Sequence, residues 1–262
     1  MHRIVHISDL HFGTEHPDLL EPLRNAINGA GADIVAVSGD LTQRARRHQF
    51  RAARAFLDSL APPWISVPGN HDVPLDKLWD RFFRPYARYR EVICEDLCPV
   101  RRLGPLTLVG LNTVNPHTWQ RGRIGLRNVR RACDTLGEAG GIGVVIAHHP
   151  FNQLPDSGKA LMRHATAAAG ALAECGAQVI LTGHLHQWRA DPFVTRQQDR
   201  NLLQVQVGTS LSRRVRGQPN DFAVLDFDDA GVEVRRMAWF APAFRTADLR
   251  RFDRIGPEWR RA

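Results

Sequence analysis

The stretch HISDLHFG, residues 6–13, places an aspartate and a histidine two positions apart directly after an apolar run. In a strand, residues i and i+2 lie on the same face. We therefore expect the first strand to end near Asp9 and to direct Asp9 and His11 at one point beyond the sheet. A carboxylate and an imidazole that converge favour a bound cation. Taken alone, the stretch is equally compatible with an ordinary loop, because Asp is common in turns.

Four further apolar runs end in a similar way, in GDLT (39–42), GNHD (69–72), AHHP (147–150) and GHLH (183–186). In open α/β sheets, ligands bind outside the carboxyl ends of the strands. We therefore expect one rim to collect Asp9, His11, Asp40, Asn70, His148 or His149, His184 and His186. A zinc site takes four ligands, so this set is too large for one ion and suits two adjacent divalent ions.

Strand and helix patterns alternate as far as GHLH, and strand patterns alone follow from residue 202. The spacing of apolar residues predicts helices over 17–31, 47–60, 126–138 and 158–176. No repeat or long linker divides the chain, so we predict one α/β domain over residues 1–262, with a β-rich part from about 202 and a short basic tail over 245–262. Residues 244–255 read as an amphipathic segment that would suit a large anionic substrate or a membrane surface.

The charge balance favours anionic partners. Lys and Arg total 35 against 27 for Asp and Glu, a formal net charge of +8. Phosphate esters, nucleic acid and acidic membrane surfaces all fit this balance, but an arginine-rich surface without a specific role fits it too. The sequence lacks a long apolar run and a signal-peptide pattern, so we expect a cytoplasmic protein. The scattered Cys94, Cys98, Cys133 and Cys175 are expected to be reduced structural thiols.

The five motifs, in this order, resemble the calcineurin-like metallophosphoesterase superfamily, whose pattern is D-x-H, G-D, G-N-H-[DE], H and G-H-x-H. The match covers every motif over residues 4–186. Within the superfamily the chain is most similar to the bacterial cyclic-nucleotide phosphodiesterase branch, a likeness that extends to VQVGTS (205–210) and NDFAVLDFD (220–228). The resemblance implies a four-layer αββα sandwich, in which helices flank two mixed β-sheets.

Carried over position by position, the resemblance also implies roles for the polar residues. One metal ion would be held by Asp9, His11 and His186, and the other by Asn70, His148 and His184, with Asp40 bridging both. His148 stands two residues before the proline, as the family ligand does, which leaves His149 to support the ligands from behind or to face substrate. His71 is similar to a non-ligand histidine that hydrogen-bonds a phosphate oxygen or protonates the leaving alkoxide, and Asp72 would orient it.

The implied activity is hydrolysis of a small anionic phosphoester by a metal-bridging hydroxide. Nitrogen and oxygen ligands without thiolate suit Mn, Fe, Zn or Co. We expect a phosphodiesterase on small nucleotides, 3',5'-cyclic AMP included, with substrate-binding side chains at Thr42, Asn112, Trp119, Arg121 and His149. Two alternatives stay open: a hydrolase of a larger anionic substrate, such as a UDP-linked lipid (a pyrophosphatase) or single-stranded nucleic acid, and a metal-bound scaffold without turnover. The complete ligand set counts against the scaffold.

Overall fold

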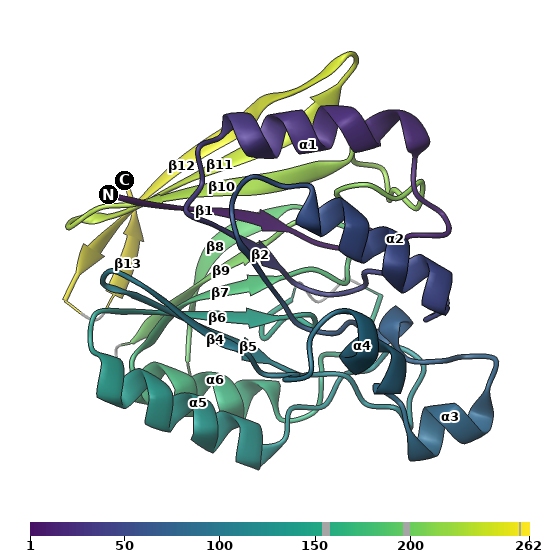
Figure 1. Cartoon of the computed structure of the whole chain (residues 1–262). Helices are drawn as coiled ribbons and strands as arrows, with labels where there is room; N and C mark the ends of the chain where they lie inside the picture. The colour runs from purple at the N-terminus through teal and green to yellow at the C-terminus, as the bar shows by residue number, and fades with distance from the viewer. Residues whose placement is uncertain (154–157, 196–199, 257) are drawn as a thin grey trace.

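The computed structural model describes residues 1–153, 158–195, 200–256 and 258–262, and it contains two β-sheets with helices on their outer faces (Figure 1). One sheet has seven strands, in the order β13 (Glu258–Arg261), β12 (Ala243–Ile255), β11 (Gly231–Phe240), β10 (Asp221–Phe227), β1 (His2–Ile7), β2 (Ile34–Val37) and β3 (Trp64–Ser66). The other has six, in the order β4 (Val100–Leu103), β5 (Leu106–Leu111), β6 (Ile142–Ala147), β7 (Ala177–Thr182), β9 (Asn201–Gln206) and β8 (Arg189–Val194).

Both sheets are mixed. In the first, β1, β2 and β3 run parallel and β10 to β13 are antiparallel. In the second, β5, β6, β7 and β9 run parallel, with the antiparallel β4 and β8 at the edges. The predicted αββα sandwich of two mixed sheets is therefore confirmed.

Alternating apolar side chains divide the core into three layers. Ile4 of β1 and Val144 of β6 belong to the cluster between the sheets. Val5 and Ile7 of β1 point the other way, where they pack with α1 (Leu20–Gly29) and α2 (Arg47–Asp58). Val145 of β6 lies in the outer cluster with α5 (Leu126–Ala139) and α6 (Ala165–Glu174). Successive side chains of a strand point to opposite faces of the sheet, and here the residues on both faces are apolar. This is the pattern of strands buried on both faces.

The predicted helices are present, but their limits differ. A 3-10 turn, η1 (Pro17–Leu19), precedes α1, and α6 begins only at Ala165 rather than at 158. His164 has a φ of 67°, a left-handed conformation that interrupts a helix before Ala165. Two short helices, α3 (Leu78–Phe83) and α4 (Ala87–Val92), follow the 3-10 turn η2 (Asn70–Asp72). Among the described residues, no helix has the length and apolar character needed to cross a membrane.

The basic C-terminal segment is part of the first sheet, and its suitability for a large anionic substrate or a membrane surface stays a prediction. β12 pairs with β11 from Ala243 to Asp253 and with β13 at its other end. Phe244 and Phe252 are buried, whereas Arg251 lies 2.7 Å from the Asp228 carboxylate and 2.9 Å from that of Asp253. Paired arginines beside buried aromatic residues fit a strand with one covered face. Residue 257 of this segment lies outside the described residues.

The cysteines differ from expectation as well. Cys133 of α5 and Cys175, which follows α6, form a disulfide, with their Cα atoms 5.0 Å apart. The prediction of reduced thiols is therefore wrong for this pair. Cys94 and Cys98 are free.

The strands that carry the five motifs end on one side of the molecule. β1, β2 and β3 run parallel in one sheet, and β6 and β7 run parallel in the other. The arrowheads of β1, β6 and β7 point the same way, and the loops that follow these strands lie on that side of the molecule (Figure 1). The fold thus brings the polar strand ends of both sheets to one rim.

Candidate metal centre

The polar residues at the rim lie beyond the strands, in turns of unusual backbone geometry. β1 ends at Ile7, β2 at Val37 and β7 at Thr182, all before the motif residues. Five of the predicted ligands have positive φ angles: Asp9 (53°), His11 (48°), Asp40 (52°), His184 (73°) and His186 (55°). The expectation that strand alternation aligns Asp9 with His11 is wrong, because left-handed turns do so instead. Such conformations are uncommon outside glycine, cost about 1–3 kcal/mol each and cluster at functional sites.

One group of side chains surrounds Asp9. Its Oδ1 lies 3.0 Å from His186 Nε2 and 3.6 Å from His11 Nε2. The two imidazole nitrogens are 3.3 Å apart, and Asp40 Oδ2 lies 3.6 Å from His11 Nε2. The other Asp9 oxygen, Oδ2, accepts hydrogen bonds from the Ser8 hydroxyl and the His184 N–H. One carboxylate oxygen and two imidazoles therefore converge while the second oxygen is fixed by the protein.

This group fits a metal ion. Zinc bonds of about 2.0–2.1 Å in tetrahedral geometry place ligand atoms about 3.3 Å apart, close to the separations around Asp9. Asp9 Oδ1 is buried and has no hydrogen-bond donor in the described part of the chain. Burial by itself raises the pKa of Asp9. His186 and His11 outweigh burial and hold this pKa well below its usual range. An ionised buried oxygen without a donor is costly unless a cation meets it.

A second group surrounds His148. Its Nδ1 donates to the Ser38 carbonyl at 2.8 Å, so Nε2 keeps its lone pair for a metal ion. Nε2 lies 3.1 Å from Asn70 Oδ1, 3.4 Å from Asp40 Oδ2 and 3.2 Å from His184 Nδ1. Burial lowers the pKa of His148, but Asp40 outweighs it and raises that pKa to about 9, so a metal ion would bind Nε2 in place of a proton. Asp40 Oδ2 thus lies near imidazoles of both groups, as a bridging ligand requires.

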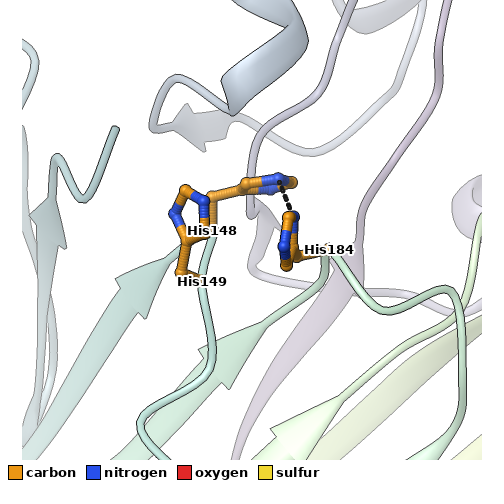
Figure 2. A group of neighbouring side chains, drawn as sticks. All are labelled: His148, His149 and His184. Atoms are coloured by element: carbon orange, nitrogen blue, oxygen red, sulfur yellow. Dashed lines mark hydrogen bonds between the residues drawn. The ribbon is translucent and has the colours of Figure 1, made fainter. Parts of the chain in front are cut away.

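His149, predicted to support the ligands or to face substrate, has both of its ring nitrogens held by other groups. Its Nε2 donates to the Gln120 carbonyl at 2.9 Å, and its Nδ1 accepts from the Thr113 hydroxyl at 2.8 Å. The His149 ring packs beside those of His148 and His184, so the three rings lie together (Figure 2). The hydrogen bond drawn among them joins His148 to His184 and does not include His149. Since both His149 nitrogens are used, His148 is the residue of the pair that has a lone pair to offer.

His71 lies at the edge of the first group, with its ring 4.9 Å from that of His11. Its Nδ1 lies 2.9 Å from the Gln43 carbonyl and its Nε2 3.1 Å from the Arg214 guanidinium. A carbonyl only accepts and a guanidinium only donates, so the ring is neutral and carries its proton on Nδ1. Burial, with His11 and Arg214, lowers the pKa of His71 to about 4, although Asp40 opposes the shift.

Asp72 does not orient His71, contrary to prediction, because the Gln43 carbonyl does so. The Asp72 carboxylate instead accepts hydrogen bonds from the backbone N–H groups of Leu41, Thr42 and Gly69, at 2.9–3.1 Å. Asp72 therefore ties the GDLT turn to the GNHD turn. Thr42, predicted to bind substrate, is buried, and its hydroxyl donates to Asp72 and to the His71 carbonyl.

The remaining predicted substrate residues lie in the loop after β5. Asn112 Oδ1 accepts from the Val114 N–H, and Arg121 Nε donates to the Leu161 carbonyl. Trp119 is 69% exposed and lies against the Arg81 guanidinium. The structure does not place Asn112, Trp119 or Arg121 in contact with the metal ligands, and their role in substrate binding stays a prediction.

Two cations beside the ligands were not predicted. Arg214 contacts His71, and its carbonyl accepts from His186 Nδ1 at 2.7 Å. Lys159 Nζ lies 3.3 Å from His184 Nε2, and burial, with Arg216, lowers the pKa of Lys159 to about 8. The basic run at 212–217 is a weak signal for Arg214, and the helix predicted over 158–176 hid the loop position of Lys159.

The geometry and fold agree with what the chain shares with known proteins. Residues 2–188 match the calcineurin-like phosphoesterase family, so the chain belongs to that family. Among curated proteins it is similar to the glycerophosphodiester phosphodiesterase GpdQ of Enterobacter lignolyticus (strain SCF1), with 32% identity over 82 residues. This match covers 26% of the chain and 29% of the relative, so the chain spans less than a third of that protein's length.

Solved structures share the fold at low identity. The purple acid phosphatase PPD1 of yellow lupin aligns over 95% of this chain and 53% of its own, with a TM-score of 0.70 and 14% identity. The phosphopantetheinyl hydrolase PptH of Mycobacterium tuberculosis aligns over 79% of this chain and 89% of its own, with a TM-score of 0.52 and 19% identity. At these identities the likeness supports the fold alone.

Proposed function

We propose that this protein is a phosphoester hydrolase with two divalent metal ions, and that it acts as a phosphodiesterase on small nucleotides such as 3',5'-cyclic AMP. The observation that carries this proposal is the placement of Asp40 Oδ2 between two ligand groups, 3.6 Å from His11 Nε2 and 3.4 Å from His148 Nε2. When bound, two metal ions supply Lewis acidity and a hydroxide nucleophile at neutral pH.

The donor set limits which ions suit the site. Carboxylate, amide and imidazole groups without thiolate suit Mn, Fe or Zn. We propose Asp9, His11 and His186 for one ion and Asn70, His148 and His184 for the other, with Asp40 shared. Asn70 is neutral, so its ion keeps more positive charge than it would beside a further carboxylate.

The chain's own cations would bind and orient the phosphate. Arg214, with the neutral His71, lies beside the group of His11, and Lys159 lies beside His184. His71 has two candidate roles, as an acid that protonates the leaving alkoxide or as a donor that holds a phosphate oxygen with Arg214. In the structure Nε2 accepts from Arg214 and Nδ1 donates to the Gln43 carbonyl, so in either role Nε2 would first take up a proton and release Arg214.

Phosphodiesters are the favoured substrate class because the curated relative is named a glycerophosphodiester phosphodiesterase. A UDP-linked lipid or single-stranded nucleic acid remains the alternative, and the net charge of +8 is compatible with it. The cytoplasmic location rests on the sequence alone, and the disulfide between Cys133 and Cys175 is more typical of oxidising compartments.

The test is a substrate screen of the purified protein with Mn(II). Bis(p-nitrophenyl) phosphate, p-nitrophenyl phosphate, cyclic AMP, glycerophosphocholine, a UDP-linked lipid and single-stranded DNA are compared at equal concentration. We expect diester hydrolysis that chelation abolishes and that returns with metal. Asp40→Ala should lose both ions by elemental analysis, whereas Asn70→Ala should keep one. Full activity with one ion per chain would contradict the two-metal proposal, and faster monoester turnover would contradict the diester preference.

A further inference from the structure

The short helix α3 presents a cluster of exposed apolar side chains, which we call the α3 patch: Leu78, Trp79, Phe82, Phe83 and the adjacent Trp119. Trp79 is 68% exposed and Phe83 is 65% exposed. The centres of their rings lie 4.1 Å apart, so each ring covers one face of the other and the outer faces stay exposed to solvent. Soluble proteins rarely expose apolar groups in such density, and large exposed patches mark contact surfaces.

The patch is held in place rather than left loose. Arg81, in the middle of α3, is buried, and its guanidinium donates to the carbonyls of Pro74 and Thr118 at 3.0 and 2.5 Å. The same guanidinium lies 5.6 Å from the centre of the Trp119 ring. A buried arginine thus fixes α3 to the segment after η2 and to the loop that carries Trp119, with the aromatic residues facing outward.

A positively charged cavity adjoins the patch. It has a volume of about 560 Å³, and its lining includes five cationic side chains, Arg46, Arg47, Lys77, Arg84 and Arg88, against two carboxylates. Arg88 and Arg84 lie 2.9 and 3.6 Å from the Asp80 carboxylate, and Arg47 pairs with Glu91. Lys77 and Arg46 form no ion pair within the described part of the chain. Lys77 and Arg84 flank α3 directly, so positive charge borders the aromatic residues.

We infer that the α3 patch docks this protein on a bilayer that contains anionic phospholipids. Trp, Phe and Leu side chains flanked by Lys and Arg are the composition of helices that lie in a membrane interface, and anionic headgroups attract clustered basic residues. A symmetric contact between two copies is disfavoured, because it would bring the cations beside one patch close to those beside the other. It would also rest on few residues, whereas stable interfaces use about 20–30 residues a side.

The patch lies on the catalytic side of the molecule. α3 projects from the end toward which β1 and β6 point (Figure 1). Pro74, which binds Arg81, stands two residues after Asp72, and Arg88 donates to the carbonyl of Ala45 in the segment after GDLT. Docking at α3 would therefore hold the metal centre near the bilayer surface. The inference concerns lipid binding alone and does not depend on which phosphoester the site hydrolyses.

The experiment is flotation of the full chain with vesicles of phosphatidylcholine, with and without 30 mol% phosphatidylglycerol. We expect binding only to the anionic vesicles, and weaker binding in high salt. Lys77→Gln with Arg84→Gln should weaken partitioning about 30-fold, because each basic residue near the surface contributes about 1 kcal/mol and 1.4 kcal/mol is tenfold. Trp79→Ser with Phe83→Ser should also lose most binding.

Matched controls come from β11, β12 and β13, at the edge of the first sheet opposite β3. Arg254 and Arg261 are exposed, so Arg254→Gln with Arg261→Gln removes the same charge elsewhere. Phe240 and Ile255 are 49% and 53% exposed, so their replacement by serine removes apolar surface away from α3. Circular dichroism establishes that each variant is folded. Failure of the wild type to bind anionic vesicles would overturn the inference, as would equal losses in the control pairs. A dimer by light scattering that Trp79→Ser with Phe83→Ser converts to monomer would assign the patch to self-association instead.

Discussion

Gly69 is the position where the smallest change should do the most harm to the metal centre. A Cβ atom at this residue would overlap the backbone nitrogen and Oδ1 of Asp40 and lie 2.8 Å from its Cα. Asp40 Oδ1 accepts the His71 N–H at 2.7 Å, and the Gly69 N–H donates to Asp72 at 2.9 Å. Gly69→Ala therefore forces the GDLT and GNHD turns apart at the residue that both ligand groups share.

The cost follows from these contacts. An extra methyl group in a packed site costs about 1–3 kcal/mol, and a hydrogen bond to a charged group contributes about 1.5–3 kcal/mol. We expect Gly69→Ala to lower the free energy of unfolding of the metal-free protein by about 3 kcal/mol. For a chain of this size, that corresponds to roughly 6–12 °C in melting temperature. The displaced Asp40 should also leave the protein with fewer than two bound ions.

The assay combines thermal unfolding in chelator with elemental analysis after reconstitution, so stability and metal content are measured separately. Gly137 is the matched control, since it lies on the exposed face of α5 and a Cβ there meets nothing within 4 Å. Gly137→Ala should raise stability by about 0.5–1 kcal/mol. If Gly69→Ala kept its melting temperature and bound two ions, the close approach of the two turns would not be what positions Asp40.

Three further predictions address individual side chains. His148→Ala should lose metal and nearly all turnover. His149→Ala should keep both ions and lose about 1–3 kcal/mol of unfolding free energy, because the Thr113 hydroxyl and the Gln120 carbonyl lose their partner. Elemental analysis and urea unfolding distinguish the two variants, and the reverse order of effects would contradict the assignment of His148 as the ligand. His71→Ala should keep its metals. If His71 holds phosphate, the variant should hydrolyse alkyl and p-nitrophenyl diesters more slowly by the same factor. If His71 is a general acid, hydrolysis of the alkyl diester should slow at least about 100-fold more than that of the p-nitrophenyl diester. Burial lowers the pKa of His6 to about 3, so the unfolded chain binds the extra proton below about pH 6.5 and His6 should cost about 2 kcal/mol of stability between pH 6.5 and 5. Urea unfolding should therefore show a loss over this range that is about 2 kcal/mol smaller in His6→Gln than in the wild type, and equal losses would contradict a neutral buried His6.

The candidate ligands could be picked out from the sequence because chemistry and position agree at each strand end. Five apolar runs each finish in Asp, Asn or His, and parallel strands deliver their carboxyl ends to one rim. The choice of His148 over His149 came from the family pattern, and the hydrogen bonds of the two rings give it a physical reason. The alternation of strand and helix predicted an α/β domain, and the family resemblance added the four-layer sandwich.

Side-chain partners in distant loops could not be predicted. Gln43, Arg214 and Lys159 reach the site from segments without a periodic pattern, where the sequence does not specify distance. The partners of the arginines in the basic C-terminal segment could not be predicted either. Their partners are carboxylates nearby on β12 and in the β10–β11 turn, as in the Arg251 contacts with Asp253 and Asp228.

The error about Asp9 and His11 is informative about how this site is built. Strand alternation would have placed their side chains on one face without strain, yet Asp9, His11, Asp40, His184 and His186 all take left-handed backbone conformations. At about 1–3 kcal/mol each, these conformations cost more than a small domain can lose without compensation. Part of the compensation is visible, since the Asp9 N–H donates to Gly39 and the His11 N–H to Asp40 across the two turns. The rest would come from the bound ions, so the metal-free protein should be much less stable than the loaded one.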